Sequence, residues 1–142
     1  MNSASAAVAS AVTFLWLGMV LAISFLEAPL KFRAPGVTAP VGLGIGRIVF
    51  RALNRVESVL AGVLLTAVAV GGPPLSVSVV TATAVLLLAV QLLLIRPGLN
   101  RRSSRVLAGE TLPRSSAHHF YVATETAKAL TLLTLGVLVS LA

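Results

Sequence analysis

Four long apolar runs dominate this sequence and constrain its fold more than any other feature. They cover residues 5–26, 46–71, 76–95 and 116–141. Each run approaches the roughly 20 residues that an α-helix needs to cross the hydrocarbon core of a bilayer. Charged residues make up 11% of the chain, whereas a soluble domain carries about 25%. The pattern therefore predicts an all-α membrane protein with a single domain, a bundle of four transmembrane helices.

The segments between the runs contain residues that interrupt helices. Residues 27–45 include Pro29 and two further prolines, and they predict an irregular loop at the membrane interface. Gly72-Pro73-Pro74 predicts a tight turn between the second and third helices. Arg96-Pro97-Gly98 predicts a sharp end to the third helix, followed by a basic loop over residues 96–115.

Basic residues gather around the loops that follow the first and third helices, whereas the termini and the turn at 71–75 contain none. Basic residues hold loops on the cytoplasmic side of a membrane. We therefore expect a multi-pass protein of the bacterial inner (plasma) membrane. Both termini would lie outside, in the periplasm, and the two basic loops would lie in the cytoplasm. The net charge of +7 is explained by this bias, and no nucleic-acid partner is predicted.

A basic stripe follows one side of the second helix. Arg47, Arg51 and Arg55 are spaced four residues apart and share one face. The stripe either holds an anion (a lipid headgroup, a nucleotide tail or an acidic partner) or consists of interfacial arginines that reach lipid phosphates. The same contact with anionic headgroups or a partner is expected of Lys31, Arg33, Arg101 and Arg102.

Glu57 lies on another face of the second helix, which it shares with Leu53 and Leu60. We expect its side chain to point into the bundle, where an ionised group needs a partner. The last helix carries Glu125 and Lys128 one turn apart. The sequence predicts a buried polar cluster near the cytoplasmic side, formed by Glu57, Glu125, Lys128 and, from late in the third helix, Gln91.

Two interpretations of this cluster stay open. It acts as a proton or ion relay or a polar pocket for a small amphipathic ligand, or it is an ion pair that fixes how the helices dock. The sequence shows no continuous polar path through all four helices, which favours the structural interpretation.

His118 and His119 raise the question of a metal or haem. Adjacent histidines on a helix point about 100° apart, so they do not readily ligate one ion together. A haem held by two histidines would need a second copy of the chain to supply one. The alternative is a pair at the membrane interface beside Phe120 and Tyr121. Cysteine and aspartate are absent, so thiolate sites and a Ser-His-Asp set are excluded, and we predict no cofactor.

Several short motifs occur in an order similar to a known family. They are Trp16-Leu17-Gly18, Phe25, Ala28-Pro29, Phe32, Phe50 and His118. The order resembles that of the uncharacterised four-helix membrane family that includes eukaryotic transmembrane protein 205. The resemblance spans most of the chain and implies a four-helix bundle with no settled activity.

The leading functional hypothesis is a small non-enzymatic accessory or structural subunit. It would pack in a homo-oligomer or a larger membrane complex, because so small a bundle buries little of its own surface. One alternative is a minimal proton, ion or small-molecule transporter that uses Glu57, Glu125 and Lys128. A second alternative is a haem- or metal-binding redox protein that uses His118 and His119.

Overall fold

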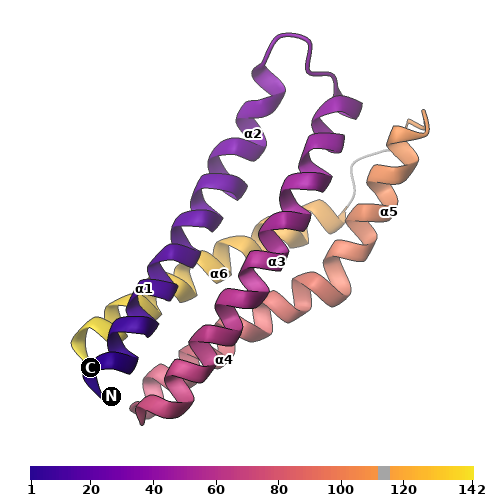
Figure 1. Ribbon diagram of the computed structural model, residues 1–142. Helices are drawn as coiled ribbons and strands as arrows, with labels where there is room; N and C mark the ends of the chain where they lie inside the picture. The colour runs from indigo at the N-terminus through magenta and orange to yellow at the C-terminus, as the bar shows by residue number, and fades with distance from the viewer. Residues whose placement is uncertain (112–115) are drawn as a thin grey trace.

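The four apolar runs form four long helices that pack side by side (Figure 1). The computed structural model describes residues 1–111 and 116–142, and no strand occurs among them. The helical spans long and apolar enough to cross a membrane are Ser3–Arg33, Ala39–Gly71, Leu75–Leu107 and His118–Leu141. The expected all-α fold with four helices capable of crossing a membrane is confirmed at this level.

The first span joins four helical segments. They are α1 (Ser3–Val20), the π-helix η1 (Leu21–Glu27), α2 (Ala28–Leu30) and the 3₁₀ turn η2 (Lys31–Arg33). The second span is α3 (Ala39–Gly71), the third joins α4 (Leu75–Val90), the π-helix η3 (Gln91–Ile95) and α5 (Arg96–Leu107), and the fourth is α6 (Ser116–Leu141). Within the bundle α6 packs against both α1 and α4, while α3 packs along α1.

Two expected breaks in the helices are wrong. Pro29 does not end the first helix, which continues to Arg33, so the loop expected over 27–45 shrinks to residues 34–38. Pro97 does not end the third helix either, because α5 continues to Leu107, and the loop expected over 96–115 is helical at least that far. The second helix also begins at Ala39, seven residues before the expected start at 46.

The π-helices explain why both prolines are tolerated. A proline ring clashes with the carbonyl four residues earlier. For Pro29 and Pro97 that carbonyl lies inside η1 and η3, respectively. In these wider turns each backbone N–H donates to the carbonyl five residues earlier: the Ala28 N–H donates to the Ile23 carbonyl and the Arg96 N–H to the Gln91 carbonyl. The widened turn makes room for the ring, so each helix continues past its proline.

The start of α3 follows ordinary capping rules. The Thr38 hydroxyl accepts a hydrogen bond from the Val41 N–H at 3.4 Å, and Pro40 lies in the first turn, where its missing N–H costs nothing. At the other end Gly72, with φ of 62°, terminates the helix in the left-handed conformation that glycine adopts without strain.

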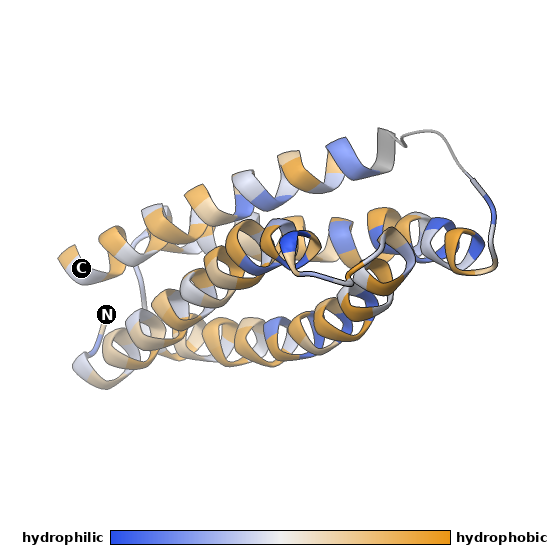
Figure 2. Cartoon of the chain, turned by 90° about the horizontal axis from the view of Figure 1, so that it is seen from above, coloured by the Kyte–Doolittle hydropathy of each residue, from blue (hydrophilic) through white to orange (hydrophobic). Residues whose placement is uncertain are grey.

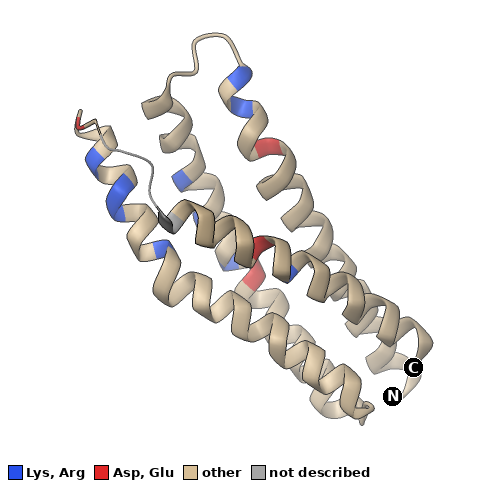
Figure 3. Ribbon diagram, turned by 180° about the vertical axis from the view of Figure 1, so that it is seen from behind, with Lys and Arg blue, Asp and Glu red and all other residues tan. Residues whose placement is uncertain are grey.

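The polarity of the residues changes along the bundle from one end to the other. Both termini lie at the same end (Figure 1), and the ribbon there is mostly hydrophobic, while hydrophilic residues increase toward the opposite end (Figure 2). Figure 3 shows that the charged residues lie from the middle of the bundle to the end away from the termini. The buried apolar core includes Leu64, Val77, Leu132 and Leu135. This arrangement leaves the polar residues of the interior in the middle of the molecule, beside an apolar half.

Candidate functional site

Lys128 is the centre of a buried polar cluster. Its side chain is 0% exposed, and its Nζ lies 2.5 Å from Glu57 Oε2 and 2.7 Å from Glu125 Oε1. Its third donor reaches Gln91 Oε1 at 2.7 Å. An ammonium group has three N–H donors, so every donor of Lys128 has an acceptor from within the chain. The structure thus brings together all four residues of the polar cluster expected from the sequence.

Glu57 is held from one side only. Its Oε2 accepts hydrogen bonds from Lys128 and, at 2.7 Å, from the indole N–H of Trp16. Its Oε1 is buried and has no hydrogen-bond partner among the described residues. Trp16 is itself 0% exposed, so α1 supplies both packing and a donor to the carboxylate of α3.

Glu125 uses both carboxylate oxygens. Its Oε2 accepts from the Tyr121 hydroxyl at 2.5 Å and from the Ser24 hydroxyl at 2.7 Å, and its Oε1 lies 3.4 Å from Gln91 Nε2. Gln91 Nε2 also donates to the Thr124 hydroxyl at 3.0 Å. We call this set the Lys128 cluster; its members are Trp16, Ser24, Glu57, Gln91, Tyr121, Thr124, Glu125 and Lys128.

Both π-helices contribute to the Lys128 cluster. Ser24 comes from η1 and Gln91 is the first residue of η3. A π turn shifts the residues after it around the helix axis and often marks a functional site. All four membrane spans therefore hold part of the cluster. The two turns that tolerate proline also place Ser24 and Gln91 beside Glu125.

The cluster contains two carboxyl groups and one ammonium group. If both carboxyl groups are ionised, one negative charge is left over, and buried charge without a counter-ion is costly. The adjacent cation is Arg96, whose guanidinium carbon lies 4.6 Å from the centre of the Tyr121 ring and 4.8 Å from that of Phe50. These two rings meet edge to face, with their centres 5.7 Å apart. Tyr121 therefore contacts Arg96 through its ring and Glu125 through its hydroxyl.

A cavity of about 450 Å³ opens beside this cluster at the basic end of the bundle. Ser24 and Tyr121, which both donate to Glu125, form part of its wall. The rest of the wall combines aromatic and aliphatic side chains with cations. We call it the large cavity; its lining includes Phe25, Phe32, Leu43, Phe50, Leu99 and Val122, together with Lys31, Arg47, Arg96 and His118.

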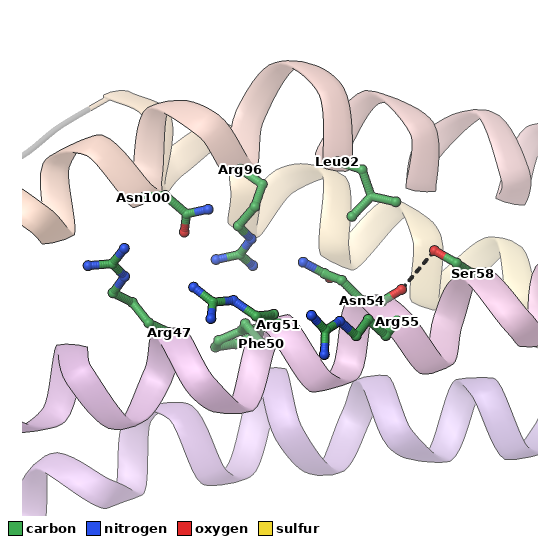
Figure 4. A pocket seen from close by; sticks show the side chains of 9 residues that line it. All are labelled: Arg47, Phe50, Arg51, Asn54, Arg55, Ser58, Leu92, Arg96 and Asn100. Atoms are coloured by element: carbon green, nitrogen blue, oxygen red, sulfur yellow. Dashed lines mark hydrogen bonds between the residues drawn. The ribbon is translucent and has the colours of Figure 1, made fainter.

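The basic stripe of α3 lies apart from the Lys128 cluster. Arg47, Arg51 and Arg55 line a second, smaller pocket of about 220 Å³ between α3 and the η3–α5 segment, where Arg96 also points (Figure 4). We call this the arginine pocket; it is completed by Phe50, Asn54, Ser58, Leu92 and Asn100. The arginine pocket and the large cavity share Arg47, Phe50, Arg96 and Asn100 as a common wall.

The remaining basic residues expected to contact anionic headgroups or a partner lie near this end. Lys31 pairs with Glu27 at 3.8 Å and lies 5.7 Å from the centre of the Phe32 ring. Arg33 and Arg101 are exposed, and Arg101 Nε donates to the Pro97 carbonyl at 3.3 Å. Arg102 is half-buried on α5.

His118 and His119 are both exposed at the start of α6, and their ring centres lie 6.0 Å apart. His118 also lines the large cavity. Within the described ranges 1–111 and 116–142, no group of three or more metal-ligating side chains is placed to hold a metal ion. The haem or metal hypothesis stays a prediction, and of its two residues His118 lines the large cavity.

The sequence interpretation missed Trp16, Ser24, Tyr121 and Arg96. Tyr121 stands one turn before Glu125, so its spacing was a usable signal. Trp16 is the only tryptophan of the chain and lies in the middle of a span, whereas this residue type usually lies at the interface. Ser24 and Arg96 gave no such signal, because their positions depend on the π turns.

No family model, no curated protein and no solved structure matches the chain. The resemblance to the transmembrane protein 205 family therefore stays a prediction.

Proposed function

We propose that this chain is a non-enzymatic multi-pass membrane protein that binds an amphipathic anionic small molecule in the large cavity. The observation that carries the proposal is the composition of the cavity wall. One part is aromatic and aliphatic, and the other presents Lys31, Arg47 and Arg96. Ligand sites of this size are mainly apolar, with a few polar groups that fix orientation.

The Lys128 cluster forms the floor of this site. It touches the cavity through Ser24 and Tyr121 and ties all four spans together beneath it. In a membrane interior such a cluster costs free energy to assemble and is retained where it orients or responds to something. We infer that it holds the cavity walls in register and senses the charge of the ligand.

The geometry favours binding over ion conduction. Toward the termini, the interior beyond the cluster is lined by apolar side chains, among them Leu64, Leu132 and Leu135. Thr13 and Thr81 are buried in the described part of the chain, but their hydroxyls have no hydrogen-bond partner there. A proton or ion passing through would have to cross this dry layer. The relay alternative is therefore less well supported than ligand binding.

We further propose that the basic end faces the cytoplasm of a bacterial inner membrane and that both termini face the periplasm. Support comes from the arginines at that end and from terminal segments without Lys or Arg side chains. Because the chain has no cysteine, single cysteines report topology directly. Ser3→Cys should react with a membrane-impermeant maleimide on intact cells, and Ala108→Cys only after the membrane is opened. The reverse pattern would refute this orientation.

Ligand binding is tested by filling the large cavity. Leu99 lines the cavity, whereas Leu93, two helical turns away, is 74% exposed and faces outward. The full chain in maltoside micelles is titrated with dodecanoate and with dodecyl phosphate, and bound copies are counted by native mass spectrometry. Leu99→Trp should reduce binding of both amphiphiles by about tenfold, while Leu93→Trp should not change it. Equal binding by both variants would refute the proposed site.

A groove on the outside of the bundle supports the accessory-subunit hypothesis as a second candidate. It measures about 670 Å³ and runs between α1 and α3, lined by small residues that include Ala4, Ser5, Gly62 and Thr66. A Cβ added to Gly62 would meet nothing within 4 Å. Small residues let a further helix approach closely in a membrane. Gly62→Cys should form a disulfide-linked dimer in membranes, and the outward-facing control Leu86→Cys should not.

A further inference from the structure

The arginine pocket collects cations from two different spans. Arg47, Arg51 and Arg55 come from α3, and Arg96 enters from the η3–α5 side. In Figure 4 the Arg96 side chain extends toward Arg51, while Arg47 and Asn100 face each other beside them. Among the residues that the structure describes, no carboxylate lines this pocket. Within the described part of the chain, none of these four arginines forms an ion pair with a carboxylate.

Arg96 carries unused hydrogen-bond donors. Its Nε and Nη2 are shielded from solvent and find no acceptor among the described residues. A buried donor left without a partner costs free energy, and buried polar groups are nearly always satisfied. Arg96 belongs to the wall that the arginine pocket and the large cavity share. An acceptor from outside the chain would therefore find these donors already in place.

The guanidinium of Arg96 is also held in position. It lies against the faces of Phe50 and Tyr121 at 4.8 Å and 4.6 Å from the ring centres. Tyr121 is in turn fixed by its hydrogen bond to Glu125. Holding a donor in its binding geometry lowers the entropy cost of binding. This distinguishes Arg96 from the exposed arginines of α5, since Arg101 donates to the Pro97 carbonyl and Arg105 pairs with Glu110.

The number of cations in the pocket selects the anion. A carboxylate brings one charge and two oxygens, whereas a phosphate monoester brings a charge of about −1.5 to −2 and three terminal oxygens. Guanidinium groups bind phosphate oxygens in pairs of parallel hydrogen bonds. Arg47, Arg51 and Arg96 carry three positive charges, so a phosphate monoester neutralises more of the charge in this pocket than a carboxylate does. Asn54 and Asn100 add neutral amide donors to the same space.

The shared wall connects this anion site to an apolar compartment. Four residues line both the arginine pocket and the large cavity: Arg47, Phe50, Arg96 and Asn100. A group bound by Arg96 therefore has apolar space directly beside it. Resting on the proposed function, we propose that the arginine pocket binds the phosphate group of a phosphate-bearing amphiphile, whose apolar chain occupies the large cavity.

The experiment compares three probes on the full chain in maltoside micelles: dodecyl phosphate, dodecanoate and inorganic phosphate. Binding is measured by native mass spectrometry and by the ligand-dependent rise in thermal stability. Dodecyl phosphate should bind at least about tenfold more tightly than dodecanoate. Arg51→Gln should remove most of that difference and leave dodecanoate binding nearly unchanged, whereas Arg96→Gln, on the wall shared with the large cavity, should weaken the binding of both amphiphiles and that of dodecyl phosphate more. Arg105→Gln, an exposed arginine on α5 outside both pockets, is the matched control and should keep the preference.

The outcomes separate this inference from the proposed function. If dodecanoate and dodecyl phosphate bind equally and Arg51→Gln changes nothing, the phosphate inference is refuted while amphiphile binding stands. If inorganic phosphate binds as tightly as dodecyl phosphate and Leu99→Trp has no effect, the phosphate site stands with a water-soluble source, and the proposed function fails. If none of the three probes binds, both proposals are refuted.

Discussion

The Lys128 cluster and the arginine pocket both place cations in the bundle, but they differ in whether the chain supplies a carboxylate partner. Lys128 is surrounded by two carboxylates and a glutamine oxygen that the chain itself supplies. Arg96 lies a short distance away with aromatic rings on two sides and no carboxylate partner among the described residues. In this bundle one cation is neutralised by carboxylates of the chain itself, while the other has no carboxylate partner among the described residues. The second arrangement is the basis of the proposed ligand site.

The strongest effect on stability should come from removing Lys128, the cation whose three donors all have acceptors within the chain. Lys128→Met keeps the side-chain volume but leaves Glu57 and Glu125 buried without a counter-ion. Breaking a buried ion pair in this way costs about 3–5 kcal/mol, so we expect the free energy of unfolding to fall by this amount in a detergent titration. The triple variant with Glu57→Gln and Glu125→Gln has no buried charge left and should recover much of the loss. A single variant as stable as the wild type would contradict the internal-neutralisation argument.

The two carboxylates should differ from each other. Both oxygens of Glu125 accept hydrogen bonds, so Glu125→Gln must turn an amide N–H₂ toward a donor. Glu57 Oε1 has no partner in the described residues, so the amide of Glu57→Gln fits there without displacing one. Because each donor left unsatisfied costs about 1–3 kcal/mol, Glu125→Gln should be about 3 kcal/mol less stable than Glu57→Gln. Equal unfolding curves would show that the hydrogen bonds do not distinguish these sites.

A smaller change tests the link between the two regions. Tyr121→Phe removes the hydroxyl that donates to Glu125 and retains the ring against Arg96. We expect a loss of about 1.5 kcal/mol, at the lower end for hydrogen bonds to a charged group, since Ser24 and Gln91 still donate to Glu125. Dodecyl phosphate binding should persist. A stability loss as large as that of Lys128→Met would mean that the ring is misplaced as well.

The smallest effect is expected in the arginine pocket, with the opposite sign. Without a ligand, Arg51→Gln removes one of four like charges and should raise stability slightly, by about 0.5 kcal/mol at low ionic strength. Because salt screens exposed charges, the gain should disappear near 1 M salt. Unfolding measured at both ionic strengths checks this. A clear loss of stability would show that Arg51 has an internal partner, and the contrast with Lys128 would fail.

Sequence reasoning predicted the four long apolar helices because they depend on local properties. A run of apolar residues near the required length predicts a membrane-spanning helix without reference to its neighbours. The spacing of residues within α3 also predicted which way Glu57 points, because helical periodicity places it on a different face from the arginines. Helix ends were harder to predict. Pro29 and Pro97 are strong local breakers, yet the π turns before them let both helices continue.

Composition and 3.6-residue periodicity were enough to predict four apolar helices, the gathering of charge toward one half, and inward-facing side chains at Glu57, Glu125 and Lys128. The packing of the helices was needed to find that Trp16, Ser24 and Tyr121 complete that cluster and that Arg96 meets the basic stripe of α3 in one pocket. The reason is physical: these residues come from different spans, far apart in sequence. Their distances depend on how the helices pack and on two widened turns, which no local pattern records.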